Sequence, residues 1–178
     1  PMRRSKRDLI LDAAVALIAA EGLEHLSYET LADAAGLSKS GLIYHFPSRH
    51  DLLLGIHRHL ADAWETELRT IAGAPAEECT DSQRLRAVVI SMGRTADLAE
   101  LIMILDARSD PEYKAVWADV DTRWMPAPDT SDAYLVQLTA YGLWAHDHVH
   151  HRPLHALRRQ LRPSRSGARL DRRQERED

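Results

Sequence analysis

The sequence has a single cysteine, a single phenylalanine and no long apolar run, and each scarcity excludes a class of protein. One cysteine, Cys79, cannot build an internal disulfide framework, which indicates a reducing cytoplasm. The longest apolar stretch, LILDAAVALIAA, is interrupted by Asp12 and is shorter than the roughly 20 residues that a membrane span needs. The basic beginning, PMRRSKRD, is not followed by a signal-peptide cleavage pattern. We therefore expect a cytoplasmic protein with no membrane partner.

Strand signals are also scarce, because β-branched alternation is rare and no hairpin signal such as Asn-Gly is present. Apolar residues instead recur every three or four positions almost throughout, which predicts an all-α fold. We expect three short helices within residues 1–47, and a long helix from Ser48 to Ile71 that leads into a helical body, residues 48–162. Residues 163–178 are basic and almost free of apolar side chains, which predicts a disordered tail.

Charge is distributed unevenly along a chain whose net charge is −4. Acidic residues outnumber basic ones in residues 61–151, whereas basic residues predominate in residues 152–178. An acidic middle excludes nucleic acid lying along the whole protein, so any contact with DNA must be local. The basic tail either attracts phosphates without sequence preference or is a solvated extension with no role.

The stretch GLSKSGLIYHFPSRHDLL, residues 36–53, does not have the pattern of a helix that only buries itself. Ser38 can cap a short helix whose first turn carries hydroxyls, a lysine and Gly41. Two short helices joined by Ala-Gly-Leu-Ser form a helix-turn-helix, and such polar groups suit phosphates and base edges in the major groove. Pro47 fixes the corner before the next helix. The alternative is an ordinary helical corner in which the serines are caps and the aromatic rings are core.

The longer segment LSYETLADAAGLSKSGLIYHFPSRHDLL resembles the DNA-binding signature of the TetR/AcrR family of bacterial repressors, over roughly Lys6 to Leu60. Together with LVQLTAYGLWAHD, it looks like the actinobacterial multidrug-responsive repressors of efflux permeases. The resemblance implies an all-helical homodimer, with an N-terminal helix-turn-helix DNA-binding domain at 1–47 and a C-terminal effector-binding and dimerisation domain at 48–162. It implies a palindromic operator in double-stranded DNA, contacted by Tyr28, Ser38, Lys39, Ser40, Gly41, Ile43, Tyr44, His45 and Arg49.

Tryptophan is plentiful, with four residues in the chain and three of them after residue 116. Rings at helical spacing, together with a thioether, suit a flat polarizable cavity, and Asp106 or Asp147 could hold a cation there. We expect a small-molecule effector, a planar lipophilic cation such as a dye or antiseptic. Plain core packing explains each ring as well. The expected effector-binding residues are Trp64, Met92, Trp117, Tyr141 and Trp144.

The segment HDHVHHRPLH offers a competing interpretation, because His146 and His150 are four apart on a helix, as are Asp147 and His151. A metal-sensing repressor, or a metal-dependent enzyme that uses the His146–His155 cluster, would place a metal there. The chain contains no GxSxG, HExxH or phosphate-loop motif. We therefore expect no enzyme, no cofactor and no metal, but a repressor that a ligand releases from DNA.

Overall fold

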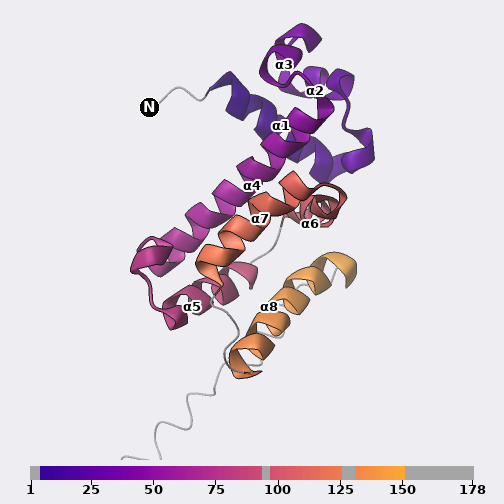
Figure 1. The fold of residues 1–178 in the computed structure, drawn as a ribbon. Coiled ribbons are helices and arrows are strands. Elements are labelled where there is room, and N and C mark those ends of the chain that lie inside the picture. Colours follow the sequence, from indigo (N-terminus) through magenta and orange to yellow (C-terminus); the bar gives the residue numbers. More distant parts are fainter. Residues whose placement is uncertain (1–4, 94–96, 126–130, 151–178) are drawn as a thin grey trace, which may run out of the picture.

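A computed structural model describes residues 5–93, 97–125 and 131–150, and within these ranges the chain is helical with no strand. Figure 1 shows a cluster of short helices at one end, a long helix that leads out of it, and a larger helical body. The prediction of an all-α fold is confirmed. The α-helices are α1 (Lys6–Glu21), α2 (Tyr28–Ala35), α3 (Lys39–His45), α4 (Arg49–Ala72), α5 (Asp81–Met92), α6 (Leu98–Asp106), α7 (Pro111–Trp124) and α8 (Ser131–His150). Single 3-10 turns are η1 (Leu23–His25), η2 (Ala76–Glu78) and η3 (Ala107–Ser109).

Serine caps set the beginnings of the first four helices, including the Ser38 cap that the sequence predicts. Ser5, Ser27 and Ser48 each form a reciprocal capping box with the residue three positions later. Ser38 caps α3 by accepting a hydrogen bond from the Gly41 amide at 3.1 Å. Each cap satisfies an amide that the helix leaves without an internal partner, so the helix boundaries are fixed locally.

The turn between α2 and α3 depends on a left-handed residue. Gly36 has φ +64° and ψ 35°, a conformation that residues with a Cβ rarely adopt, and it ends α2. The chain then reverses into α3, whose inner face buries Leu42 and Phe46 at 1% exposure each. This packing holds α3 against α2 while its opposite face remains in solvent.

A close approach between Phe46 and α4 fixes the corner that follows α3. A Cβ added at Gly55 would lie 2.6 Å from Phe46 Cε1 and 3.4 Å from Leu11 Cδ2, so the ring lies directly on the α4 backbone. The Arg7 guanidinium lies 5.0 Å from the centre of the same ring. The orientation of α3 is therefore tied to α1 and α4 through one aromatic side chain.

The α4 helix is the central element of the fold. The sequence predicts one apolar stripe along it, but residues 52–57 are buried without interruption. The reason is that α1, α6 and α7 all pack against α4 and surround it at this level. Beyond this level, α4 continues beside α5 and α7 to the end of the body (Figure 1).

Several predictions lie outside the described residues, namely the tail at 163–178, the helix from Pro153 and most of the loop MPAPDTSD. The proposed boundaries at 47 and 162 therefore stay predictions. Within the described ranges, none of the helices combines the length and apolarity that crossing a membrane would take.

Candidate DNA-binding surface and effector pocket

The outer face of α3 is exposed where the sequence predicts DNA contact. Ser38, Lys39 and Ser40 are exposed, and Tyr44 is 83% exposed although it lies between the buried Leu42 and Phe46. Ile43 is 41% exposed. A tyrosine this exposed contributes nothing to the core, so the helix has one face that packs and one face that is open to solvent.

The first turn of α3 presents a compact set of small polar groups. The Ser38 and Ser40 hydroxyls lie 3.1 Å apart, and a Cβ added at Gly41 would lie 3.2 Å from Ser38 Oγ. Glycine at this position therefore keeps the cap undistorted and lets another molecule approach the backbone. Hydroxyls and amides at this spacing suit phosphate oxygens and base edges.

Lys39 is paired with Glu29 of α2 through an exposed ion pair. The hydrogen bond from Lys39 lowers the pKa of Glu29, so this carboxylate is ionised at neutral pH. Exposed ion pairs are weak, so a phosphate can compete for the lysine. Glu29 is itself exposed and would repel a phosphate placed close to it.

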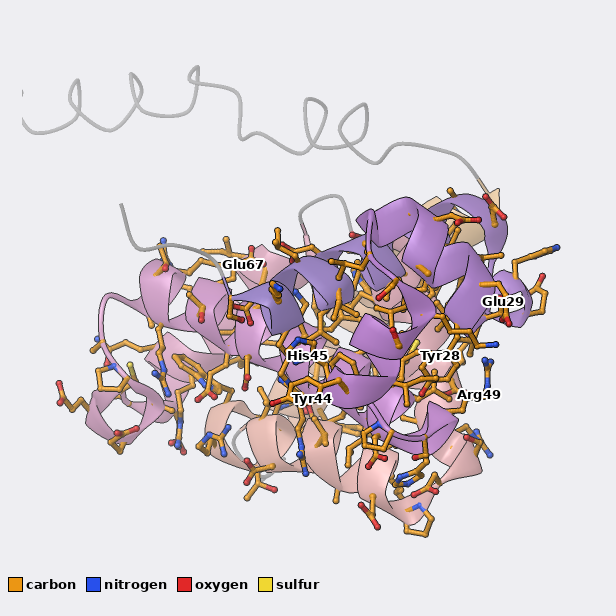
Figure 2. All side chains as sticks on the ribbon, turned by 90° about the horizontal axis from the view of Figure 1, so that it is seen from above. Tyr28, Glu29, Tyr44, His45, Arg49 and Glu67 are labelled. Carbon is orange, nitrogen blue, oxygen red and sulfur yellow. The ribbon has the colours of Figure 1, made fainter. Side chains whose placement is uncertain are left out.

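Tyr28 and Arg49 hold the motif together as well as lying beside it. The Tyr28 hydroxyl donates to the Phe46 carbonyl at 2.6 Å, and Arg49 Nη1 donates to the Leu26 carbonyl at 2.5 Å. Arg49 is exposed and keeps further donors, whereas Tyr28 is half-buried. Figure 2, which is seen from above, shows Tyr28 and Arg49 near each other and Tyr44 beside His45. The DNA contacts assigned to the nine residues remain predictions.

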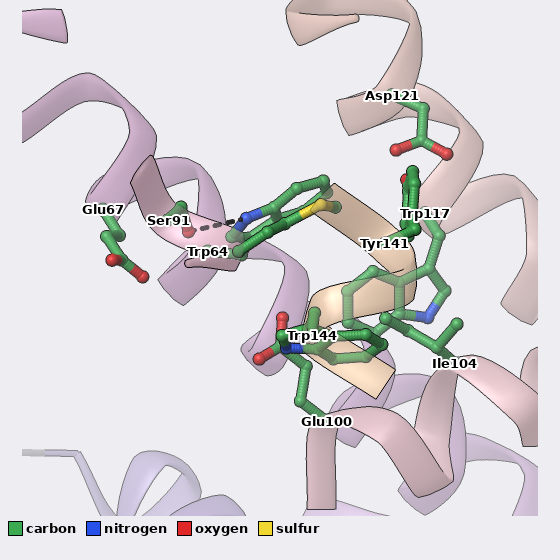
Figure 3. A pocket seen from close by; sticks show the side chains of 10 residues that line it. Trp64, Glu67, Ser91, Glu100, Ile104, Trp117, Asp121, Tyr141 and Trp144 are labelled. Carbon is green, nitrogen blue, oxygen red and sulfur yellow. Dashed lines mark hydrogen bonds between the residues drawn. The ribbon is translucent and has the colours of Figure 1, made fainter. Parts of the chain in front are cut away.

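The five residues predicted for effector binding line one pocket, which has a volume of about 300 Å³. The helices that contribute are α4, α5, α6, α7 and α8, so the pocket lies inside the helical body (Figure 3). The structure therefore brings together side chains that are up to 80 positions apart in the sequence. The full lining is Trp64, Glu67, Ser91, Met92, Glu100, Ile104, Trp117, Asp121, Tyr141 and Trp144.

The aromatic walls are fixed by polar bonds at their edges. Trp64 Nε1 donates to Ser91 Oγ at 3.2 Å, a bond drawn in Figure 3, and the Trp64 and Trp117 ring centres are 6.4 Å apart. The Tyr141 hydroxyl contacts Met125 Sδ at 3.5 Å. Rings held in this way form preorganised apolar walls, as in ligand pockets.

Three carboxyl groups in the lining were missed in the sequence. Burial, followed by the nearby charges of Glu67 and Asp97, raises the pKa of Glu100 to about 7. Burial raises the pKa of Asp121 to about 6. Helical spacing could have found two of them, because Glu67 follows Trp64 by three positions and Asp121 follows Trp117 by four. The lining thus contains three acids and no basic residue.

The two acids suggested from the sequence are not part of this lining. Asp106 instead lies 3.3 Å from His57 Nε2, and the side chain of Asp147 lies outside the described residues. Trp124 is also absent from the pocket, because its Nε1 donates to Glu65 Oε1 at 3.2 Å in the α4–α7 core. Glu65 binds Arg123 as well, and the hydrogen bonds from this arginine lower the pKa of Glu65 to about 2.

The competing metal site falls mostly outside the described residues, since only His146 of the His146–His155 cluster has a described side chain. In the part of the chain that the structure describes, no group of three or more His, Cys, Asp and Glu side chains could hold a metal ion. The metal-sensing alternative for the His146–His155 cluster, and the expectation that no metal is bound there, are therefore not tested by the described residues.

Residues 10–56 match the family model described as bacterial regulatory proteins, tetR family. The HTH-type transcriptional regulator RutR of Escherichia coli K12 is 34% identical over 65 residues, which are 36% of this chain and 31% of RutR. The match thus spans about a third of the length of this curated relative. The segment that matches contains α2, α3 and the turn between them, so the likeness lies in the helix-turn-helix. Over residues 10–56 the resemblance to the TetR family is therefore confirmed.

Solved structures extend the likeness to the helical body. A transcriptional regulator from Streptomyces coelicolor A3(2), SCO7518, superposes with a TM-score of 0.63 and 21% identity, covering 84% of this chain and 91% of that chain. The multidrug binding protein EbrR, complexed with malachite green, superposes with a TM-score of 0.55 and 23% identity, covering 80% and 83%. At these identities the likeness concerns the fold.

Proposed function

We propose that the chain is a cytoplasmic, ligand-responsive transcriptional repressor that binds a palindromic operator as a homodimer and is released by a planar lipophilic cation. One observation carries the proposal. A single helix, α4, begins at the corner after the exposed α3 and also carries two residues of the pocket, Trp64 and Glu67. A ligand that moves this helix at one end changes the position of α3 at the other.

The DNA-binding part rests on the exposed face of α3. In this proposal the Ser38, Lys39, Ser40 and Gly41 turn enters the major groove, and Tyr44 contacts a flanking phosphate. Two subunits would place their α3 helices about 34 Å apart, one turn of DNA, which matches a palindrome.

The dimer part rests on α8. Five apolar side chains of this helix are between 41% and 58% exposed, far more than a helix facing only water carries. Three of them, Leu135, Val136 and Leu143, line an apolar groove that α8 forms with Val89 of α5 and with Gly93, which follows α5. A second copy of the same face would cover them, in agreement with the homodimer that the family resemblance implies. These residues are Tyr134, Leu135, Val136, Leu138 and Leu143.

The effector part rests on the composition of the pocket. Flat rings on several walls suit a planar molecule, and three acids with no basic residue in the lining suit a positive charge. That a protein of similar fold, EbrR, was solved with malachite green supports this class of ligand. Such cations are toxic dyes and antiseptics, so we infer that the repressed gene encodes an efflux transporter.

A binding selection followed by a release assay tests the proposal. The protein would select duplexes from a random library, and malachite green would then be titrated into the complex, with fluorescein as an anionic planar control. We expect a palindromic consensus and release by malachite green alone. A protein that selects no sequence contradicts the DNA-binding part, and selection without release contradicts the effector part. Loss of DNA binding on chelation would instead support the metal-sensing alternative.

A further inference from the structure

A fully buried histidine in the middle of α4 belongs neither to the DNA-binding surface nor to the pocket lining. His57 is 0% exposed; its Nδ1 lies 3.0 Å from Trp117 Nε1, and its Nε2 lies 3.3 Å from Asp106 Oδ2. Burial lowers the pKa of His57 against the opposing effect of Asp106, so the ring is neutral at neutral pH. An indole N–H can only donate, so His57 Nδ1 accepts the hydrogen bond from Trp117. The imidazole proton is then on Nε2, and this N–H donates a hydrogen bond to Asp106.

These two bonds tie two walls of the pocket to α4. Trp117, on α7, lines the pocket with its ring. Asp106 is the last residue of α6, the helix that supplies Glu100 and Ile104 to the same pocket. Since α6 also packs against α1, the junction at His57 lies where the pocket meets the N-terminal helices. A ligand that displaces either wall must therefore act on His57.

A row of stacked rings continues from His57 toward α3. Tyr113 of α7 lies between two histidines of α4, with its ring centre 4.6 Å from His57 and 5.1 Å from His50. The Tyr113 hydroxyl donates to the His50 carbonyl at 3.4 Å, and Asp110 lies 3.4 Å from His50 Nε2. His50 is in the first turn of α4, directly after the corner that follows α3. The contacts thus run from the pocket wall to the helix-turn-helix without a gap.

We propose that His57 couples the pocket to DNA binding, as a positioning residue that holds α4 in its DNA-binding orientation only while Trp117 donates to it. The inference rests on the function proposed above. A cation lying against Trp117 turns the indole, removes the donor from a buried acceptor and frees α4 to tilt with His50 and α3. Because the bond exists in one state alone, it gives the ligand the differential affinity that any release from DNA requires.

Two substitutions break this bond in different ways, and a third serves as a matched control. Trp117→Phe keeps an aromatic wall in the pocket and removes the indole donor. His57→Leu removes both bonds of the imidazole. Trp64→Phe also removes an indole donor from the pocket, but that indole binds Ser91 of α5 and not His57. All three proteins would be checked by circular dichroism before use.

The readout is the operator Kd, measured by fluorescence anisotropy with and without saturating malachite green, on a duplex selected by the wild-type protein. For wild type we expect the dye to raise the Kd by about 5- to 150-fold, the usual range of such coupling. For Trp117→Phe and His57→Leu we expect a weaker operator Kd without dye and almost no further change with it. Trp64→Phe should need a higher dye concentration, but its operator Kd with saturating dye, divided by the Kd without dye, should reach the wild-type ratio. A merely structural role of Trp117 would not explain this difference between the two variants.

The outcomes separate this inference from the proposed function. If both variants keep the wild-type operator Kd and the wild-type ratio, His57 does not couple the two sites. If Trp64→Phe loses the ratio as fully as Trp117→Phe, the effect belongs to the pocket in general and the inference is also wrong. A wild-type protein that binds the operator but ignores the dye contradicts the proposed effector class alone. In that case the operator Kd of the two variants without dye still tests whether His57 holds α4 in its DNA-binding orientation, and a wild-type Kd in both would contradict this.

Discussion

In the function proposed above, the carboxyl groups of the pocket lining select a positively charged effector. Glu100 and Asp121 are protonated for part of the time near neutral pH, because burial raises their pKa values to about 7 and about 6. A bound cation stabilises their ionised forms, so cation binding and proton release are linked. When these two carboxyl groups ionise without a bound ligand, their burial lowers the stability of the folded protein. We therefore expect Glu100 and Asp121 to strengthen cation binding and to weaken the fold.

Replacing Glu100 separates these two effects. The folded carboxyl has a pKa of about 7 against an ordinary value of 4.5, so its stabilising contribution is complete below about pH 4.5 and is lost as the pH rises through about 7. Glu100→Gln carries no charge at any pH. We therefore expect the variant to match wild type near pH 5 and to be more stable by on the order of 2 kcal/mol near pH 8, in urea unfolding.

The same variant should bind cations less tightly. With ethidium, whose charge is constant over this range, wild-type affinity should rise up to about tenfold between pH 6 and pH 8, as Glu100 ionises. Glu100→Gln should bind more weakly at pH 8 and lose most of this rise, whereas Glu112→Gln, an exposed acid at the start of α7, should behave as wild type. A Glu100→Gln protein with the full wild-type pH profile would show that this carboxyl does not meet the cation.

At the scale of the element, the corner between α3 and α4 depends on the absence of a side chain at Gly55. Phe46 is 1% exposed and its ring lies on the helix backbone at that position, so a methyl group at 2.6 Å must displace the ring. Since the ring also holds α3 in place, we expect its displacement to disturb DNA binding as well as stability.

Gly55→Ala should lower the free energy of unfolding by about 1–3 kcal/mol, the range for overpacking, although alanine is the better helix former. The operator Kd should rise with it. In a Phe46→Leu background the ring atom that clashes is gone, so the same glycine substitution should have a much smaller effect. Equal effects in both backgrounds would contradict the proposed contact.

Helix beginnings and helix type could be predicted from the sequence because they are local. Ser38 caps its helix and the long helix begins after Ser48, as the pattern predicts, and the apolar periods continue from there. The five predicted pocket residues also lie together, because large apolar side chains on several helices of one small body are buried in the same interior. Which helices pack around α4 depends on segments far away in the sequence, so the full burial of residues 52–57 could not be predicted.

The same distinction explains the residues that the sequence analysis missed. His57 looks like any polar residue of α4 until α6 and α7 supply Asp106 and Trp117. Glu100 looks like a surface acid until the other walls of the pocket bury it. Tyr28 and Arg49 look like DNA contacts only, because their bonds to the Phe46 and Leu26 carbonyls join residues about 20 positions apart. Polar function of this kind arises from tertiary packing.

For the whole molecule, the account requires two copies. One copy leaves a row of apolar side chains on α8 exposed, and one α3 helix reads only half of a palindrome. In the proposed homodimer, pairing of the two copies would both bury these apolar side chains and set the spacing of the two α3 helices. A ligand that tilts α4 would change that spacing and so release both DNA contacts.

A charge placed in the α8 row tests the dimer. Leu138 is 49% exposed, so Leu138→Glu should leave the folded subunit and its dye binding unchanged. Across a dimer interface the two new carboxylates would meet in an apolar surface, so we expect monomers by analytical ultracentrifugation and loss of operator binding. Ala118→Glu, on the exposed face of α7, is the control and should stay dimeric. A dimeric Leu138→Glu protein would place the interface elsewhere.

The most direct test of the whole account is the operator affinity of a protein without the Lys39 ammonium and the Tyr44 ring. Both side chains are exposed and neither supports the core, so the Lys39→Ala, Tyr44→Ala double variant should keep the wild-type fold and dye binding. Each lost contact should weaken binding by about 1–3 kcal/mol, so we predict a rise in the operator Kd of at least about 30-fold. An unchanged operator Kd in a folded, dimeric double variant would contradict the claim that α3 is the surface through which this protein binds DNA.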